Sequence, residues 1–230
     1  KDVSDAIIAM DLEFQPGSKY SYSDLGMILL MEISEIVSRR SLNEMTKTWL
    51  FMPLSMNSTM YIPEKVLLSR IVPTEFDSLY RSGLVHGVVH DENTHLIGGV
   101  SSHAGLFSTA ENLANYAQML INNGTWLGKR IFTESLIKEF TTRQYLPEDS
   151  DYALGWDTPS QNGKSSAGDY FSNSSFGHLG FTGTSLWIDP EEKIIVILLT
   201  NRVHPTRDRG GMYGIRREFH NAVIEELLIN

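Results

Sequence analysis

The stretch FGHLGFTGTSLW at residues 176–187 decides the fold that this sequence predicts. Its glycines let the backbone approach a ligand closely and adopt positive φ angles. From Thr184 onward, successive side chains are expected on opposite faces of a strand. The turn DPEEK at residues 189–193 then leads into the apolar run IIVILL at residues 194–199, which is typical of a strand buried on both faces. The sequence therefore predicts a β-hairpin whose second strand is buried.

His178 lies at the leading edge of this hairpin and has two interpretations. Its imidazole could face a cleft and transfer protons. Alternatively, the neighbouring glycines only shape a tight hairpin, and His178 is a surface residue. The stretch by itself leaves both interpretations open.

Composition excludes several classes of function. The 230 residues carry a formal net charge of -9 and include no cysteine, so disulfides, thiolate metal sites and a cysteine nucleophile are excluded. The negative charge argues against nucleic acid as a partner, and we interpret the arginine pairs at residues 39–40 and 216–217 as helix-end or surface charges. No apolar run reaches the ~18 residues of a membrane span. We predict no cofactor.

The remaining patterns predict a single domain over residues 1–230. Residues 16–145 are expected to be mostly helical, and residues 150–230 to hold the hairpin and a C-terminal helix. That helix, residues 213–228, is predicted to pack on the sheet through one apolar stripe. The stripe consists of Ile215, Phe219, Val223 and Leu227.

Tyr22 stands at the entry to a second predicted helix. Residues 25–37 are apolar nearly all round, which favours a buried helix, and Ser23 or Asp24 is a suitable N-cap. The Tyr22 phenol could therefore face a cleft and act with His178 in proton transfer. A buried tyrosine and an unrelated histidine is the alternative.

Histidines and carboxylates gather between residues 86 and 103. Such groups can bind Zn²⁺, but their spacing does not fit a helical H-E-x-x-H site. We favour hydrogen bonds, with Asn93 among the partners, that tie down a glycine-rich loop, and we predict no metal. The cluster consists of His86, His90, Asp91, Glu92, His95 and His103.

A literal S-x-x-K pattern occurs at Ser135 and Lys138. In serine acyl-transferring enzymes this spacing puts a hydroxyl and its lysine base on one face of a helix. Here both residues fall on the polar side of a short amphipathic helix. We therefore interpret them as a solvated helix face.

Four motifs in order resemble the serine β-lactamase and penicillin-binding-protein clan, and most closely its class C, DD-peptidase and esterase branch. They are PGSKYSYSDLG at residues 16–26, WLFMPLSM at 49–56, GGVSSHAGLFSTA at 98–110 and GHLGFTGT at 177–184. The VHDEN segment at residues 89–93 also resembles β-lactamase-like modules that follow a family-3 glycosidase, a β-N-acetylhexosaminidase, in some bacterial chains.

The resemblance implies an α+β fold of the β-lactamase/transpeptidase type, an antiparallel sheet with flanking helices and a helical region. It implies that the Tyr22 phenol assists proton transfer to and from the nucleophile and the leaving group. It also implies that His178 lines the substrate-carboxylate side of the cleft, and that a backbone N–H within residues 183–185 contributes to an oxyanion hole. The implied substrate-binding residues are Asp24, Gly180, Thr182, Gly183 and Thr184.

Two departures from the family pattern matter. Asp24 stands where the family usually has asparagine, and an ionised acid cannot donate a hydrogen bond as an amide does. No S-x-x-K precedes Tyr22, so we expect the nucleophile, with the N-terminal part of the fold, in sequence before Lys1. The sheet would then have an open edge through which the chain could self-associate.

These observations predict the C-terminal part of a bacterial serine hydrolase that is periplasmic or otherwise exported. It would act through an acyl-enzyme on an ester, amide or β-lactam bond of a small-molecule or peptide substrate. The 230 residues alone are expected to be inactive. The alternative is a non-catalytic relative that keeps the cleft as a binding module.

Overall fold

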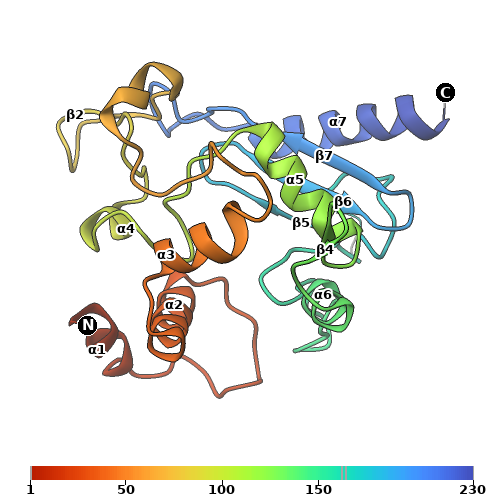
Figure 1. The fold of residues 1–230 in the computed structure, drawn as a ribbon, viewed down its shortest axis with the longest axis horizontal. Coiled ribbons are helices and arrows are strands. Elements are labelled where there is room, and N and C mark those ends of the chain that lie inside the picture. The colour runs from red at the N-terminus through yellow and green to blue at the C-terminus, as the bar shows by residue number, and fades with distance from the viewer. Residues whose placement is uncertain (1, 162, 164, 230) are drawn as a thin grey trace. The chain divides into compact units, whose positions relative to one another are not determined.

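The computed structural model describes residues 2–161, 163 and 165–229. The chain divides into two compact units. The amino-terminal unit comprises Lys1–Thr109 with His204–Thr206, and the sheet unit comprises Ala110–Val203 with Arg207–Asn230. Figure 1 follows the chain through both. No helix within the described ranges is long and apolar enough to cross a membrane.

The amino-terminal unit is mostly helical, with one short hairpin. Its elements are α1 (Asp2–Ile8), α2 (Asp24–Ser38), α3 (Leu42–Thr46), the π-helix η1 (Lys47–Phe51), the 3₁₀-helix η2 (Lys65–Arg70), the paired strands β1 (Phe76–Asp77) and β2 (Gly83–Leu84), and α4 (Glu92–Leu96).

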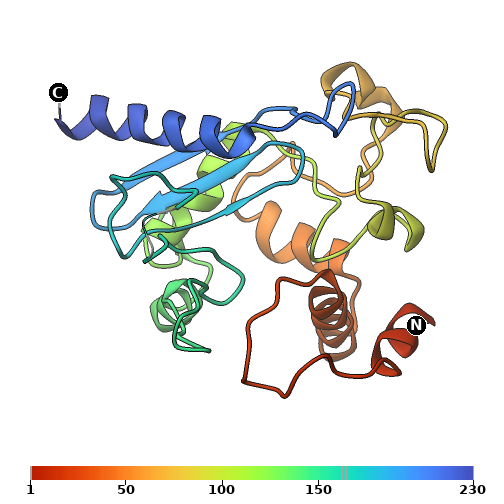
Figure 2. The same ribbon diagram turned by 180° about the vertical axis from the view of Figure 1, so that it is seen from behind.

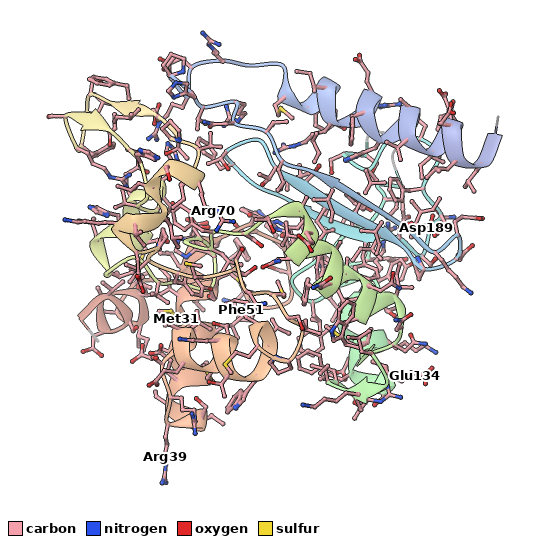
Figure 3. The ribbon with its side chains drawn as sticks, turned by 45° about the horizontal axis from the view of Figure 1, so that its top comes forward. Met31, Arg39, Phe51, Arg70, Glu134 and Asp189 are labelled. Carbon is pink, nitrogen blue, oxygen red and sulfur yellow. The ribbon has the colours of Figure 1, made fainter. Side chains whose placement is uncertain are left out.

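Helix α2 begins and ends as its sequence directs, but it is not buried all round. The Ser23 hydroxyl accepts a hydrogen bond from the Leu25 N–H at 3.2 Å, and Arg39, at φ 55°, ends the helix with its side chain projecting outward (Figure 3). Contacts come from α1 and α3, while Ile36 and Val37 are 68% and 80% exposed. The prediction of a fully buried helix was therefore wrong, because neighbouring helices cover only part of its surface.

The sheet unit contains the predicted hairpin and most of the buried hydrophobic side chains. Its elements are α5 (Ala110–Ile121), β3 (Thr125–Trp126), β4 (Lys129–Arg130), α6 (Glu134–Thr141), β5 (Phe176–Leu179), β6 (Ser185–Asp189), β7 (Ile194–Leu198), α7 (Met212–Ile224) and the π-helix η3 (Glu225–Ile229).

Strands β5, β6 and β7 form one antiparallel sheet in that order. In its register, Trp187 of β6 lies between Gly177 and Val196. The hairpin between β6 and β7 is confirmed, but the more deeply buried strand is β6, with Trp187 and Ile188 fully buried. The prediction placed the burial in the second strand. It was wrong because β6 is central, whereas β7 pairs with β6 alone among the described strands.

The turn between β6 and β7 is closed by a buried carboxylate. Asp189, labelled at the end of β6 in Figure 3, is fully buried. Its Oδ1 accepts hydrogen bonds from the N–H groups of Glu191 at 3.0 Å and Glu192 at 3.1 Å. Its Oδ2 accepts from the Ser172 N–H at 2.8 Å. The aspartate that signals the turn thus also anchors the preceding loop to the sheet.

Helices α5 and α7 cover the two sides of this sheet (Figures 1 and 2). The face toward α7 contains the main hydrophobic cluster of the unit. That cluster consists of Ala167, Phe171, Trp187, Val196 and Ile224.

Helix α7 packs mainly through a face next to the predicted one, although Val223 of the predicted stripe does pack against the hydrophobic cluster. Its buried side chains are Met212, Arg216, His220 and Ile224. By contrast, Ile215 is 53% exposed and Leu227 61% exposed. The apolar stripe mispredicted the buried face, because the side chains of Arg216 and His220 are buried and form hydrogen bonds with the rest of the sheet unit. His220 bridges the Ser185 hydroxyl at 3.0 Å and the Ser166 carbonyl at 2.9 Å, and burial lowers the pKa of this imidazole.

Candidate functional site

The predicted site residues fall into both units. Tyr22 and Asp24 belong to the amino-terminal unit, whereas His178 and the residues of the turn at 180–184 belong to the sheet unit. The structure brings the second group together at one end of β5 and β6. The pairing of Tyr22 with His178 stays a prediction.

His178 lies on β5, directly opposite Leu186 of β6. Its Nδ1 is 2.8 Å from the carbonyl oxygen of Leu179. A carbonyl can only accept, so we assign the ring proton to Nδ1. In the neutral ring, Nε2 is then the nitrogen that can accept a proton, which is the state that a general base requires.

The turn at residues 180–184 closes on itself. The Gly180 N–H donates to the Thr184 carbonyl at 2.8 Å, and the Gly183 N–H donates to the Gly180 carbonyl at 3.0 Å. Gly183 has φ +114°, which favours glycine strongly over any residue with a side chain. Because its N–H is used inside the turn, the predicted oxyanion donor is left to Thr184 or Ser185.

Arg216 of α7 forms hydrogen bonds with the same turn. The sequence did not predict this role for Arg216. Its Nη2 donates to the carbonyl oxygens of Gly180 at 2.6 Å and Thr184 at 2.7 Å. The residue is buried, and burial lowers the pKa of its guanidinium. The prediction of helix-end or surface charge for the Arg216–Arg217 pair holds only for Arg217.

Residues that follow β7 also form hydrogen bonds with this turn. The Thr200 hydroxyl donates to the Gly183 carbonyl at 2.6 Å. The Arg202 N–H donates to the Thr182 carbonyl at 2.9 Å. The Arg202 guanidinium lies 4.4 Å from the centre of the exposed Phe181 ring. The turn is therefore held by hydrogen bonds on both sides of Gly183, and Phe181 is its exposed aromatic side chain.

In the amino-terminal unit, Tyr22 immediately precedes the α2 N-cap, Ser23. The Tyr22 side chain is 65% exposed, so within its own unit the phenol is accessible to a ligand. Asp24 is the first residue of α2. A pocket of about 430 Å³ lies elsewhere in this unit, with Met31, labelled in Figure 3, in its wall, and no predicted site residue lines it.

Three histidines of this segment form hydrogen bonds of the predicted kind, whereas Asn93 is exposed and, among the described residues, accepts only through its backbone carbonyl. His90 Nε2 lies 2.7 Å from Glu75 Oε2, and His86 Nε2 lies 2.8 Å from the Ile71 carbonyl. His103 Nδ1 lies 2.8 Å from the Ser101 hydroxyl. These histidines tie loops together, and His95, on α4, is exposed.

One arrangement in this unit was not predicted. His103 Nε2 lies 3.1 Å from Asp91 Oδ1, and Asp24 joins them so that one ligand atom from each residue lies within 4.8 Å of the others. Burial by itself would raise the pKa of Asp91, but hydrogen bonds from Thr94 and His103 hold that pKa below its ordinary value. Asp24 could not be found from sequence spacing, since only the fold brings it to this loop.

The S-x-x-K pattern lies on α6, as predicted, and on its solvated face. Ser135 and Lys138 are both exposed, while Ile137 between them is buried. The Ser135 hydroxyl lies 3.2 Å from the Thr133 hydroxyl, at the N-cap of the helix. The recorded partner of this serine is thus another hydroxyl and not a general base, which an activated nucleophile needs.

The sequence of this chain is similar to those of known proteins. The chain is 34% identical over 210 residues to a protein of Salmonella paratyphi B named as a D-alanyl-D-alanine carboxypeptidase. The match covers 84% of this chain and 48% of that protein, so the chain spans about half the length of this relative.

Solved structures share the fold at lower identity. A beta-lactamase from Mycobacterium bovis aligns with a TM-score of 0.65 at 20% identity, over 93% of this chain and 66% of that one. The octameric penicillin-binding protein homologue from Pyrococcus abyssi aligns with a TM-score of 0.61 at 22% identity, over 93% of this chain and 44% of that one. These alignments confirm the predicted α+β fold of the β-lactamase/transpeptidase type.

The model of the family described as Beta-lactamase matches residues 1–220, nearly the whole chain. This match shows that the chain belongs to the family described as Beta-lactamase.

Proposed function

We propose that this chain is the carboxy-terminal part of an enzyme that hydrolyses an ester, amide or β-lactam bond through an acyl-serine intermediate. The observation that carries the proposal is the turn at residues 180–184 beside His178. Its backbone is fixed by Arg216 and Thr200, so its carbonyl and N–H groups are positioned before a substrate arrives. Such preorganisation is what acyl transfer requires of a substrate-binding strand.

Proton transfer is assigned to Tyr22 and His178. The Tyr22 phenol would exchange a proton with the nucleophile and with the leaving group. The Nε2 atom of His178 would take up a proton and donate a hydrogen bond to the carboxylate side of the substrate, and Thr182 and Thr184 would supply hydroxyl groups at the turn. The serine and lysine that these groups serve would come from sequence before Lys1.

The relative named as a D-alanyl-D-alanine carboxypeptidase suggests a peptide that ends in a free carboxylate as the substrate class. An exported location would suit such a substrate. Self-association through the free edge of β7 is a further part of this proposal, because β7 is paired on one side only among the described strands.

A binding module without catalysis is the second candidate. Asp24 favours it, because this carboxylate stands where the family has an amide that donates a hydrogen bond. Such a module would retain the turn and Tyr22 but would have no S-x-x-K in the part of its gene that encodes sequence before Lys1.

Labelling with a fluorescent penicillin distinguishes the two candidates. The product of the complete gene should become covalently labelled, whereas the 230-residue chain and a gene product without its S-x-x-K serine should not. A fluorophosphonate extends the test to esterases that do not accept penicillins. If neither reagent labels the complete product, the binding-module candidate replaces the enzyme. If the 230-residue chain itself labels, the nucleophile lies within it.

A further inference from the structure

Three ionisable side chains from separate segments converge in the amino-terminal unit. Asp24 begins α2, Asp91 is the N-cap of α4, and His103 lies in the loop that follows α4. One ligand atom from each lies within 4.8 Å of the others. We propose that Asp24, Asp91 and His103 bind a divalent transition-metal ion of the Zn²⁺ class, contrary to the prediction of no metal made from the sequence. This inference does not depend on the proposed hydrolase activity.

The donor set fits that class of ion. One imidazole nitrogen with two carboxylate oxygens suits Zn²⁺, whereas Mg²⁺ and Ca²⁺ favour oxygen ligands alone. Zinc bonds of ~2.1 Å at tetrahedral angles put two ligand atoms roughly 3.4 Å apart. His103 Nε2 and Asp91 Oδ1, at 3.1 Å, are already near that separation. Three protein ligands would leave the fourth position for water.

The imidazole is held in the orientation that a ligand needs. The His103 side chain is only 6% exposed, and its Nδ1 lies 2.8 Å from the Ser101 hydroxyl, which directs Nε2 toward the carboxylates. A hydrogen bond on the second ring nitrogen is the usual support of a metal-bound histidine. The Ser102 hydroxyl donates to the Met27 carbonyl, and this contact ties the loop to the first turn of α2, where Asp24 lies.

The charges in the cluster are not balanced by the chain. Two carboxylates this close repel one another when both are ionised. Within the described part of the chain, His103 is the only cationic group at ion-pair distance from Asp24 or Asp91. A neutral imidazole leaves two negative charges and a protonated one leaves a single negative charge, so a divalent cation compensates the cluster better than a proton does.

Asp91 is likewise fixed before a ligand arrives. Its Oδ1 accepts the Thr94 N–H at 2.7 Å, which leaves the carboxylate one geometry relative to the ring. The competing explanation is that His103 is simply an imidazolium shared between two carboxylates. The two explanations differ in one measurable property, which is affinity for a metal ion.

Calorimetric titration of the 230-residue chain with zinc chloride, after treatment with EDTA and dialysis, tests the site. We expect one equivalent of Zn²⁺ to bind, and Asp24→Asn and His103→Gln each to weaken binding at least about tenfold. The matched controls are Asp11→Asn and His95→Gln, at exposed positions outside the cluster, and we expect both to bind like the unmodified chain.

Thermal unfolding in EDTA checks that every variant folds. If His103→Gln does not fold, Asp24→Asn carries the test, because Asp24 is partly exposed and asparagine keeps its shape. The proposal is overturned if Zn²⁺ shows no saturable binding, or if Asp24→Asn binds Zn²⁺ as tightly as the unmodified chain. Equal affinity for magnesium chloride would overturn the assignment to the transition-metal class.

Discussion

At the scale of single residues, Arg216 connects α7 to the proposed substrate turn through two backbone carbonyls. Replacing it by glutamine removes a charged donor from two carbonyls that each keep one backbone N–H partner, so Arg216→Gln should lower the free energy of unfolding by about 2 kcal/mol. Arg217→Gln is the matched control, because Arg217 pairs with Asp169 at the surface and its loss should matter far less. Urea denaturation of both variants measures this, and equal effects would show that the two carbonyls do not depend on Arg216.

A second prediction at the scale of single residues concerns Asp157. Its backbone pairs with Gly177, the residue before His178, and burial raises the pKa of its carboxyl group from 3.8 to about 6. Between these values the folded chain keeps a proton that the unfolded chain has lost. Its stability should therefore decrease as the pH rises through this window, by at most about 3 kcal/mol.

Asp157→Asn cannot ionise and should lack this decrease. Urea denaturation at pH 4.5 and pH 7.0 measures it as the difference between the two free energies of unfolding. An identical decrease in the variant would mean that Asp157 does not titrate in this range in the folded chain.

At the scale of elements, the packing of β5 on β6 depends on Gly177. A Cβ atom there would lie 2.4 Å from the ring of Trp187, which is fully buried and has no room to move. Gly177→Ala should cost about 1–3 kcal/mol of stability through overpacking. Gly214→Ala is the control, because Gly214 lies in α7 with open space around it and alanine should stabilise a helix by up to ~1 kcal/mol.

Thermal unfolding of both glycine variants checks the sign as well as the size of the change. A Gly177→Ala variant as stable as the unmodified chain would mean that β5 can move away from β6 at little cost. That outcome would also weaken the account of the hydrogen-bonded turn, since the same two strands hold it.

Helix α7 shows why some elements could be predicted better than others. The β6–β7 hairpin follows from a turn residue and an apolar run, which are local signals. The buried face of α7 depends on Arg216 and His220 finding partners in the turn and in Ser185, and no local pattern contains those partners. A periodic apolar stripe was therefore placed one residue away from the face that packs.

At the scale of the whole molecule, the motif order predicted the fold and the family, both of which the comparisons confirm. The cluster of Asp24, Asp91 and His103 was not predictable, because it joins segments that are distant in sequence. A site shared by Tyr22 and His178 is predicted from the order of the motifs and not from a local pattern, and it stays a prediction. That arrangement is the central claim of the functional account.

The rate at which a fluorescent penicillin acylates the complete gene product tests this claim most directly. It is measured for the unmodified protein, Tyr22→Phe, His178→Gln and the double variant. We predict that each single change slows acylation by about 100-fold or more, and that the double variant is far faster than the product of the two effects implies, because groups serving one proton transfer are not additive. Two effects that multiply fully would contradict a shared site.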